Sequence, residues 1–137
     1  MKVYRYEELE VGQTEVFERR ISADMLTEFC RISGDLNPLH TEDEFAWAHG
    51  FPGRVVYGML TASFYSCLAG VYLPGRNCLL QGIKIDFCKP VYIGDRLTVK
   101  GEIIEKNDSV RQIVLKAWIV NQDGKKVSRA KIEAGVL

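Results

Sequence analysis

The chain has 137 residues, the usual length of one domain, and we expect a single domain over residues 1–137. Its 18 basic and 18 acidic side chains cancel and form no dense basic run, which argues against nucleic acid as a partner. The N-terminus is charged where a secretory signal would be apolar, and no stretch is apolar for the length of a membrane span. We therefore expect a cytoplasmic protein with no membrane partner.

The first elements predicted along the chain are a strand and a helix. Residues 14–21 have the pattern of a strand. Ser22 then has the character of a helix N-cap, and Gly34 is placed to end the helix. Between them apolar side chains recur at helical spacing, at Met25, Leu26, Phe29 and Ile32. We expect these four to form the buried face of that helix.

The next segment, SGDLNPLH, predicts a bend between two side chains that are capable of acid–base chemistry. Pro38 lacks an amide proton and disfavours helical dihedrals at Asn37, so the chain must bend between Asp35 and His40. Such a bend can bring a carboxylate and an imidazole to one small volume, as acid–base chemistry requires. The alternative is that Asp35 only forms an Asx-turn over Asn37 and Pro38. That interpretation explains Asp35, Asn37 and Pro38 but assigns no role to His40.

A short helix is predicted after the bend. Thr41 followed by Glu44 fits a capping box, and the helix should end near residue 50. Trp47 and Phe51 are expected in the core, because aromatic side chains usually serve packing. His49 has no partner in the sequence and is expected to be a residue of the helix end or loop.

A buried helix and several strands are predicted for the rest of the chain. Residues 58–73 are apolar or small and carry no charge, which predicts a helix inside the protein. Four strands are predicted within 77–91, 95–106, 109–120 and 125–137. Their short connections predict antiparallel pairing of sequential neighbours. The expected fold class is α+β, an antiparallel sheet of about five strands curled around a central helix.

The four cysteines argue against a disulfide framework and a metal site. Cys30, Cys67, Cys78 and Cys88 include no CxxC pair and lie in apolar stretches. We expect buried free thiols, with no metal and no other cofactor.

Three runs of the sequence resemble a known family. SGDLNPLHTEDEFA, GFPGRVVYGMLTAS and QGIKIDFCKPVYIGDRL are similar to segments of the MaoC-type dehydratases of the hotdog superfamily, specifically the (R)-specific enoyl-CoA hydratases. The resemblance implies one MaoC-like hotdog domain over 1–137. It also implies reversible hydration of a trans-2-enoyl thioester to an (R)-3-hydroxyacyl thioester, carried on coenzyme A or acyl carrier protein.

The resemblance also implies roles for individual residues. Asp35 would act as general base and His40 would protonate the α-carbon, with the roles exchanged in dehydration. Gly58, at the start of the central helix, would donate its amide to the thioester carbonyl. Asn37 would orient the pair. Ser66 is a supporting residue by resemblance, and packing inside a buried helix explains it equally well.

Two further positions bear on the substrate. The residue before Gly58 is commonly histidine in the family and is Tyr57 in this chain, which affects the local hydrogen bonding and shape. Ala69 and Gly70 have little side-chain volume and are candidates for an acyl pocket, or simply allow a strand to pack closely. Loose candidates for contact with substrate phosphates are Arg54, Arg76, Lys84 and Lys89.

Two other functions remain open from the sequence. A hotdog thioesterase would hydrolyse the thioester, although the Asp-x-Asn-Pro-x-His arrangement argues against it. A non-catalytic acyl-thioester-binding subunit would lack Asp35 or His40, and both are present. An open sheet edge and the resemblance both predict a homodimer or higher homo-oligomer.

Overall fold

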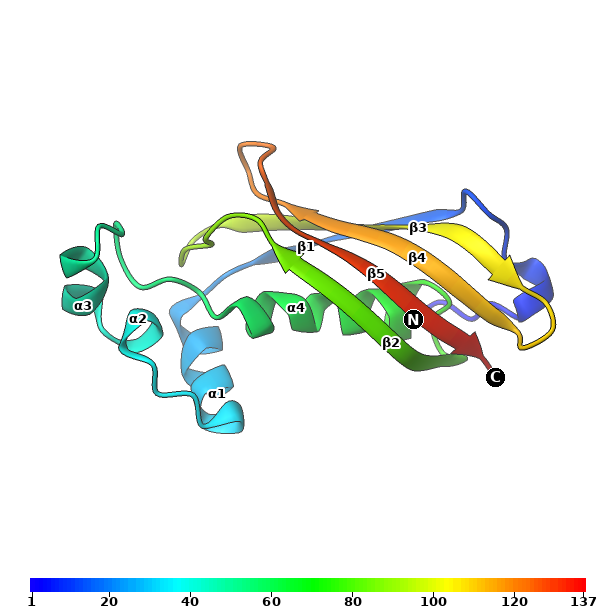
Figure 1. Ribbon diagram of the computed structural model, residues 1–137, viewed down its shortest axis with the longest axis horizontal. Helices are drawn as coiled ribbons and strands as arrows, with labels where there is room; N and C mark the ends of the chain where they lie inside the picture. The colour runs from blue at the N-terminus through cyan, green and yellow to red at the C-terminus, as the bar shows by residue number, and fades with distance from the viewer.

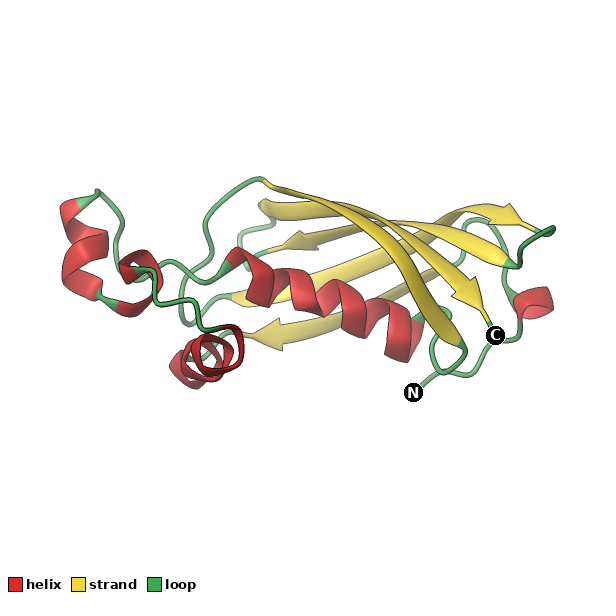
Figure 2. Cartoon of the chain, turned by 60° about the horizontal axis from the view of Figure 1, so that its bottom comes forward, coloured by secondary structure: helices red, strands yellow, loops and turns green.

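The computed structural model describes residues 1–137 and contains one five-stranded antiparallel sheet. The strands are β1 (Thr14–Arg20), β2 (Cys78–Phe87), β3 (Arg96–Asn107), β4 (Gln112–Val120) and β5 (Lys126–Val136), in the order β1-β3-β4-β5-β2. The sheet curls over helix α4 (Gly58–Cys67), which lies along one face (Figures 1 and 2). The predicted α+β hotdog arrangement is confirmed.

Alternation along the strands creates the core between sheet and helix. In β4, Leu115 and Ile119 are fully buried and Lys116 is exposed, so one face of the sheet packs on α4 and the other meets solvent. The uncharged α4 contributes Leu60 and Tyr65 to the same core. None of the helices is both long and apolar enough to cross a membrane.

The central helix does not run unbroken to residue 73 as the sequence predicted. The α-helix ends at Cys67 and continues as a π-helical turn, η2 (Leu68–Tyr72). Leu68 is fully buried against β3, where a Cβ on Gly101 would lie 2.6 Å from Leu68 Cδ2. The close approach of helix and sheet therefore depends on glycine at position 101.

The predicted antiparallel pairing of sequential strands is confirmed for β3 with β4 and for β4 with β5, and is wrong for β2 with β3. β2 pairs with β5 and not with β3, because residues 88–95 cross from the β2 edge towards β3. Backbone hydrogen bonds attach this crossover to β5 at one point and to the segment before α4 at another. The Cys88 amide donates to Val127 O at 2.8 Å, and the Val56 amide donates to Val91 O at 2.8 Å. The crossover therefore passes the beginning of α4.

Helix α1 (Ala23–Ser33) begins and ends where the sequence predicts. Ser22 Oγ accepts from the Met25 amide at 3.3 Å, and Gly34 ends the helix with φ of 73°. The expected buried face is only partly correct, because Leu26 is buried and Ile32 is 85% exposed. The reason is position, since α1 lies at one end of the molecule and not under the sheet (Figure 1).

The segment after the bend contains two short helices where one was predicted. Asn37 caps α2 (Pro38–Thr41), and Pro38 occupies its first turn, where a missing amide proton costs nothing. Helix α3 (Asp43–Ala48) then starts from Glu42. The predicted capping box at Thr41 is therefore wrong, because Thr41 ends α2 and donates its hydroxyl to Asn37 O at 3.4 Å.

Two burial expectations for this region and the cysteines are corrected as well. Trp47 is 57% exposed because α3 projects away from the sheet, and its indole donates to Pro52 O at 3.1 Å. Phe51 is half-buried. Cys88 is exposed because it follows the end of β2, while the other three thiols are half-buried. All four cysteines are free.

A short 3₁₀ helix, η1 (Tyr6–Glu8), precedes β1.

Candidate active site

The bend between Asp35 and His40 is built from consecutive side-chain caps. Ser33 Oγ accepts from the Asp35 amide at 3.2 Å, and Asp35 Oδ1 accepts from the Asn37 amide at 3.0 Å. Asn37 Oδ1 in turn accepts from the Leu39 amide at 3.0 Å, which starts the helix that carries His40. The Asx-turn of Asp35 therefore exists, and it leads directly into the histidine helix.

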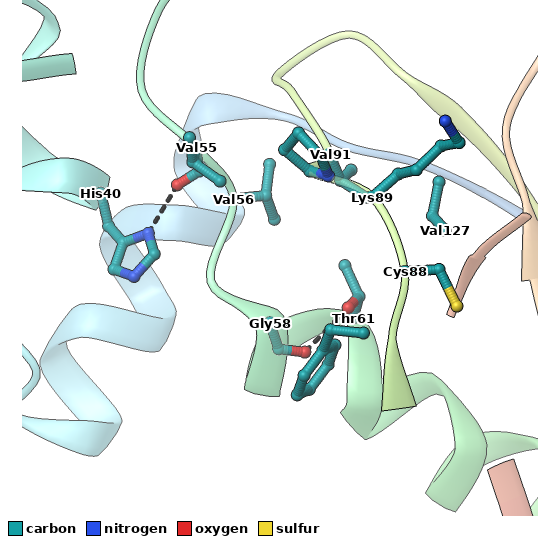
Figure 3. Close-up of a pocket in the computed structure, with 11 residues that line it drawn as sticks. His40, Val55, Val56, Gly58, Thr61, Cys88, Lys89, Val91 and Val127 are labelled. Atoms are coloured by element: carbon teal, nitrogen blue, oxygen red, sulfur yellow. Dashed lines mark hydrogen bonds between the residues drawn. The ribbon is translucent and has the colours of Figure 1, made fainter. Parts of the chain in front are cut away.

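His40 is held in one orientation by the backbone of a distant segment. Its Nδ1 lies 2.7 Å from Val55 O (Figure 3). Because a carbonyl oxygen can only accept, Nδ1 carries a proton in this contact. In neutral His40 the lone pair is therefore on Nε2, which is free to exchange a proton with a ligand.

Tyr57 joins the two predicted catalytic residues. Its hydroxyl donates to the backbone oxygen of Asp35 at 2.8 Å, and its ring centroid is 4.2 Å from that of His40. The ring is also 5.0 Å from that of Phe29 on α1. Burial, followed by the neighbouring Cys30 thiol, raises the pKa of Tyr57 to about 12. The hydroxyl therefore remains a donor at physiological pH.

Gly58 presents an amide at the start of the central helix. As the first residue of α4 it has no intrahelical acceptor for its N–H, and the positive end of the helix dipole lies there. A Cβ at this position would lie 3.1 Å from Phe87 Cε1, so glycine keeps the approach open. Thr61 Oγ1 donates to Gly58 O at 2.8 Å and closes the first turn.

His40 and Gly58 line the same cavity, whose volume is about 290 Å³. Figure 3 shows the cavity between the start of α4 and the crossover segment. The other lining residues come from the approach to α4, α4 itself, the end of β2, the crossover and β5: Val55, Val56, Thr61, Phe87, Cys88, Lys89, Pro90, Val91 and Val127. The arrangement offers an imidazole and a helix N-terminal amide to one mostly apolar volume.

A second cavity lies on another side of His40. It measures about 350 Å³ and is lined by residues of α1, α2 and the segment leading to α4: Leu26, Thr27, Cys30, Arg31, His40, Thr41, Arg54 and Tyr57. His40 thus borders both cavities, so an elongated ligand bound at the imidazole can extend into either one.

Several predicted residues lie outside these cavities. The Asp35 side chain is exposed and lines neither of them, although its Oδ2 atom accepts no hydrogen bond from the protein. Ser66 is exposed on α4. Ala69 is buried, and a Cβ on Gly70 would meet no atom within 4 Å.

Of the four cations named from the sequence, two border the cavities. Lys89 lines the cavity shared with Gly58, and Arg54 lines the second one, where its Nε is 3.7 Å from Asp43 Oδ1. Arg76 and Lys84 border neither cavity.

Of the residues that form the cavity wall opposite His40, sequence reasoning singled out only Lys89. Thr61, Phe87, Cys88, Pro90 and Val91 were assigned only to a helix and to a strand with its following turn. The useful signal was the Cys-Lys-Pro-Val stretch, where proline interrupts the strand pattern and marks the start of the crossover.

Comparisons with known proteins agree with this geometry. Residues 8–125 match the family model described as MaoC like domain. The chain is 37% identical to a 3-hydroxybutyryl-CoA dehydratase of Methylorubrum extorquens over 77% of this chain and 67% of that protein. It is 35% identical to an (R)-specific enoyl-CoA hydratase of Aeromonas caviae over 85% of this chain and 87% of that protein. A solved (R)-hydratase structure from Aeromonas caviae superposes with a TM-score of 0.92, at 31% identity, covering 96% of this chain and 99% of that one.

Proposed function

The chain belongs to the family of MaoC-like domain proteins, and we propose that it is a hydratase and dehydratase of acyl thioesters. It adds water to a trans-2-enoyl thioester to give the (R)-3-hydroxyacyl thioester, and removes water in reverse. The observation that carries the proposal is the shared cavity of His40 and the Gly58 amide. Hydration needs both, because charge grows on the thioester oxygen while protons are moved.

Gly58 supplies the electrostatic part of the mechanism. The thioester carbonyl accepts from the Gly58 N–H, at the positive end of α4. Negative charge that develops on this oxygen as water attacks C3 is then stabilised by a fixed donor. The apolar cavity walls strengthen that interaction by excluding solvent.

Asp35 and His40 supply the proton transfers. In hydration, Asp35 takes a proton from the attacking water, and protonated His40 gives the Nε2 proton to C2. In dehydration, neutral His40 takes the C2 proton at Nε2, and protonated Asp35 gives its proton to the departing hydroxyl. The Val55 carbonyl holds the Nδ1 proton throughout, which leaves Nε2 as the reacting atom.

The supporting residues hold this pair in place. The backbone amide of Asn37 donates to the Asp35 carboxylate, and the Asn37 side chain caps the helix that carries His40. Asn37 therefore orients both residues of the pair. Tyr57 occupies the position where histidine is common in the family. It supports the pair through its contacts with Asp35 O and the His40 ring. Ser66 supports the acyl chain from the exposed side of α4.

The acyl chain extends along α4 towards Ala69 and Gly70 in this proposal. The space beside Gly70 supports that direction, and buried Ala69 forms the floor beneath it. Small side chains at both positions favour acyl groups longer than crotonyl, with each buried methylene contributing up to about 0.8 kcal/mol.

We propose a homodimer as the working form. β2 is an edge strand of the sheet, and it exposes Leu79, Leu80, Ile83 and Phe87, while Met59 of α4 is 61% exposed nearby in the fold. A second copy of the chain would cover these apolar side chains. We place the protein in the cytoplasm, whose reducing conditions suit four free thiols.

The test is an assay of crotonyl-CoA with purified protein. Hydration removes the ultraviolet absorbance of the conjugated enoyl thioester and releases no thiol, and chiral analysis of the product should give the (R)-3-hydroxy form. Release of free coenzyme A without loss of the alkene would identify a thioesterase. Saturable binding with neither change would identify an acyl-thioester-binding subunit, and either of these outcomes rejects the proposal.

A further inference from the structure

A row of lysines crosses three strands on the outer face of the sheet. Lys84 of β2 is paired in register with Lys131 of β5, and Lys131 is paired with Lys116 of β4. Directly opposed residues on one face have Cβ atoms about 5 Å apart. Buried Ala130 and Ile132 flank Lys131 along the strand, so the lysines face away from α4 and towards solvent. We call Lys84, Lys116 and Lys131 the lysine row.

The positive charge of this row is only partly offset by its neighbours. Glu102 of β3 is directly opposite Lys116 in the strand register, and exposed Glu133 lies two residues from Lys131 on the same face. None of the five ion pairs of the structure includes Lys84, Lys116 or Lys131. Like charges directly opposite one another destabilise a sheet. The chain as a whole has a formal net charge of zero, so the row is a local concentration and not a general property of the surface.

The lysine row borders a hollow of about 420 Å³ that also contains an aromatic side chain. Trp118 is half-buried in its floor, with Lys116 Nζ 5.9 Å from the ring centroid. Arg129 and Asp86 form an exposed ion pair at 3.0 Å beside it, and Lys126 adds another cation. The hollow therefore combines a tryptophan and an arginine, residue types that are enriched at binding hot spots, with several lysines.

The hollow lies at the same end of the sheet as the catalytic cavity. Phe87 and Val127 line that cavity, and their chain neighbours Asp86 and Lys126 line the hollow on the other face. Lys84 is three residues from Phe87, or about 10 Å along the strand. A carrier bound at the lysine row therefore places its phosphopantetheine arm near the end of β2, and the arm has to pass around that end to reach His40 and Gly58 on the other face of the sheet.

We propose that the lysine row is the docking surface for an acyl carrier protein, which binds through its Asp and Glu side chains. This inference rests on the proposed function and specifies the carrier of its substrate. Charge complementarity favours an acidic protein, because Lys84, Lys116, Lys131, Lys126 and Arg129 gather around one hollow on the outer face of the sheet, away from the catalytic cavity. The attraction mainly accelerates association and weakens as salt rises.

The test compares crotonyl-acyl carrier protein with crotonyl-CoA as substrates. The variant Lys84→Gln/Lys116→Gln/Lys131→Gln removes three charges, and Lys2→Gln/Arg5→Gln/Arg20→Gln removes three exposed charges elsewhere as the matched control. We expect the lysine-row variant to lose about tenfold or more in kcat/KM for the carrier substrate, and the loss to shrink at high salt. Its kcat/KM for crotonyl-CoA should stay within about twofold of wild type, and the control should retain both activities.

Direct binding separates a failed docking surface from a failed function. Titration of fluorescently labelled holo-acyl carrier protein with wild-type protein should give saturable binding that the lysine-row variant weakens by the same factor, even if neither substrate is hydrated. Unchanged carrier binding and kinetics in the variant, or an equal loss with both substrates, would overturn the proposal. So would tighter, lysine-dependent binding of a duplex oligonucleotide than of the carrier.

Discussion

At the scale of single residues, the site is built so that His40 and Asp35 share one support. Tyr57 contacts the backbone of Asp35 through its hydroxyl and the imidazole of His40 through its ring. The Tyr57 hydroxyl bonds the backbone of Asp35 and neither its carboxylate nor the His40 imidazole. We therefore propose that Tyr57 positions the pair and takes no part in proton transfer.

The variant Tyr57→Phe tests this positioning role. It removes one hydrogen bond, and we expect a loss of about 1 kcal/mol in stability together with about a tenfold fall in kcat. Tyr65→Phe is the matched control, because Tyr65 is also buried and shares a hydrogen bond of 2.7 Å with Ser128 inside the core. It should lose similar stability and keep its kcat. Equal falls in kcat for the two variants would mean that the effect of Tyr57 is only structural.

At the scale of elements, the start of α4 and the crossover define the cavity, and the segment that follows α4 is the proposed path of the acyl chain. The start of α4 is fixed by Gly58 against Phe87, and the residue that follows its end, Leu68, packs against Gly101. From Leu68 onwards the α-helix continues as the π-helical turn that contains Ala69 and Gly70. Chain-length preference should therefore respond to changes in η2 and not to changes at the helix start.

Ala69→Leu tests the acyl direction. On the proposed path it should lower kcat/KM for medium-chain enoyl thioesters by about tenfold or more while sparing crotonyl substrates. Gly70→Ala should fold normally, because a methyl group there meets no protein atom within 4 Å, and on the proposed path it should lower medium-chain activity by less than Ala69→Leu. A fall in stability and in all activities together would instead show that Ala69 serves packing.

Local patterns in the sequence were enough to predict the strands, helix α1 and the bend at Asp35. Each depends on neighbours in the chain, such as the Ser22 cap, Gly34 and the Asn37–Pro38 pair. The π-helical turn and the crossover depend on distant contacts, such as that between Leu68 and Gly101, which no local pattern records. Apart from Lys89, the cavity wall at residues 87–91 was missed for the same reason, because its place depends on where the crossover passes.

At the scale of the whole molecule, the edge strand β2 should determine oligomeric state. Light scattering coupled to size-exclusion chromatography should give the mass of a dimer of this 15.5 kDa chain at micromolar concentration. Ile83→Lys places a charge among the exposed apolar residues of β2 and should yield monomers. Val110→Lys, in the exposed β3–β4 turn, should remain dimeric. A monomeric wild type would contradict the proposed assembly.

Global stability should fall at alkaline pH because of buried tyrosines. Burial, first among the causes, raises the pKa of Tyr6, Tyr57 and Tyr65 from 10.0 to about 12. Between these values the unfolded state has lost protons that the folded state retains, so stability decreases as pH rises from about 10 to 12. Urea unfolding midpoints should show this decrease, and Tyr65→Phe should reduce its slope. A slope unchanged in that variant would mean that Tyr65 does not contribute.

The central claim is that Asp35 and His40 act as one catalytic unit, and a double-mutant cycle on crotonyl hydration tests it most directly. Asp35→Asn keeps an oxygen for the Asn37 amide and His40→Gln keeps polarity, so both variants should fold, with His49→Gln, the other histidine, as control. We expect each single variant to lower kcat by about 10²- to 10⁴-fold and the double variant to lose little more. Strictly additive losses, or near-wild-type kcat in either single variant, would contradict the account.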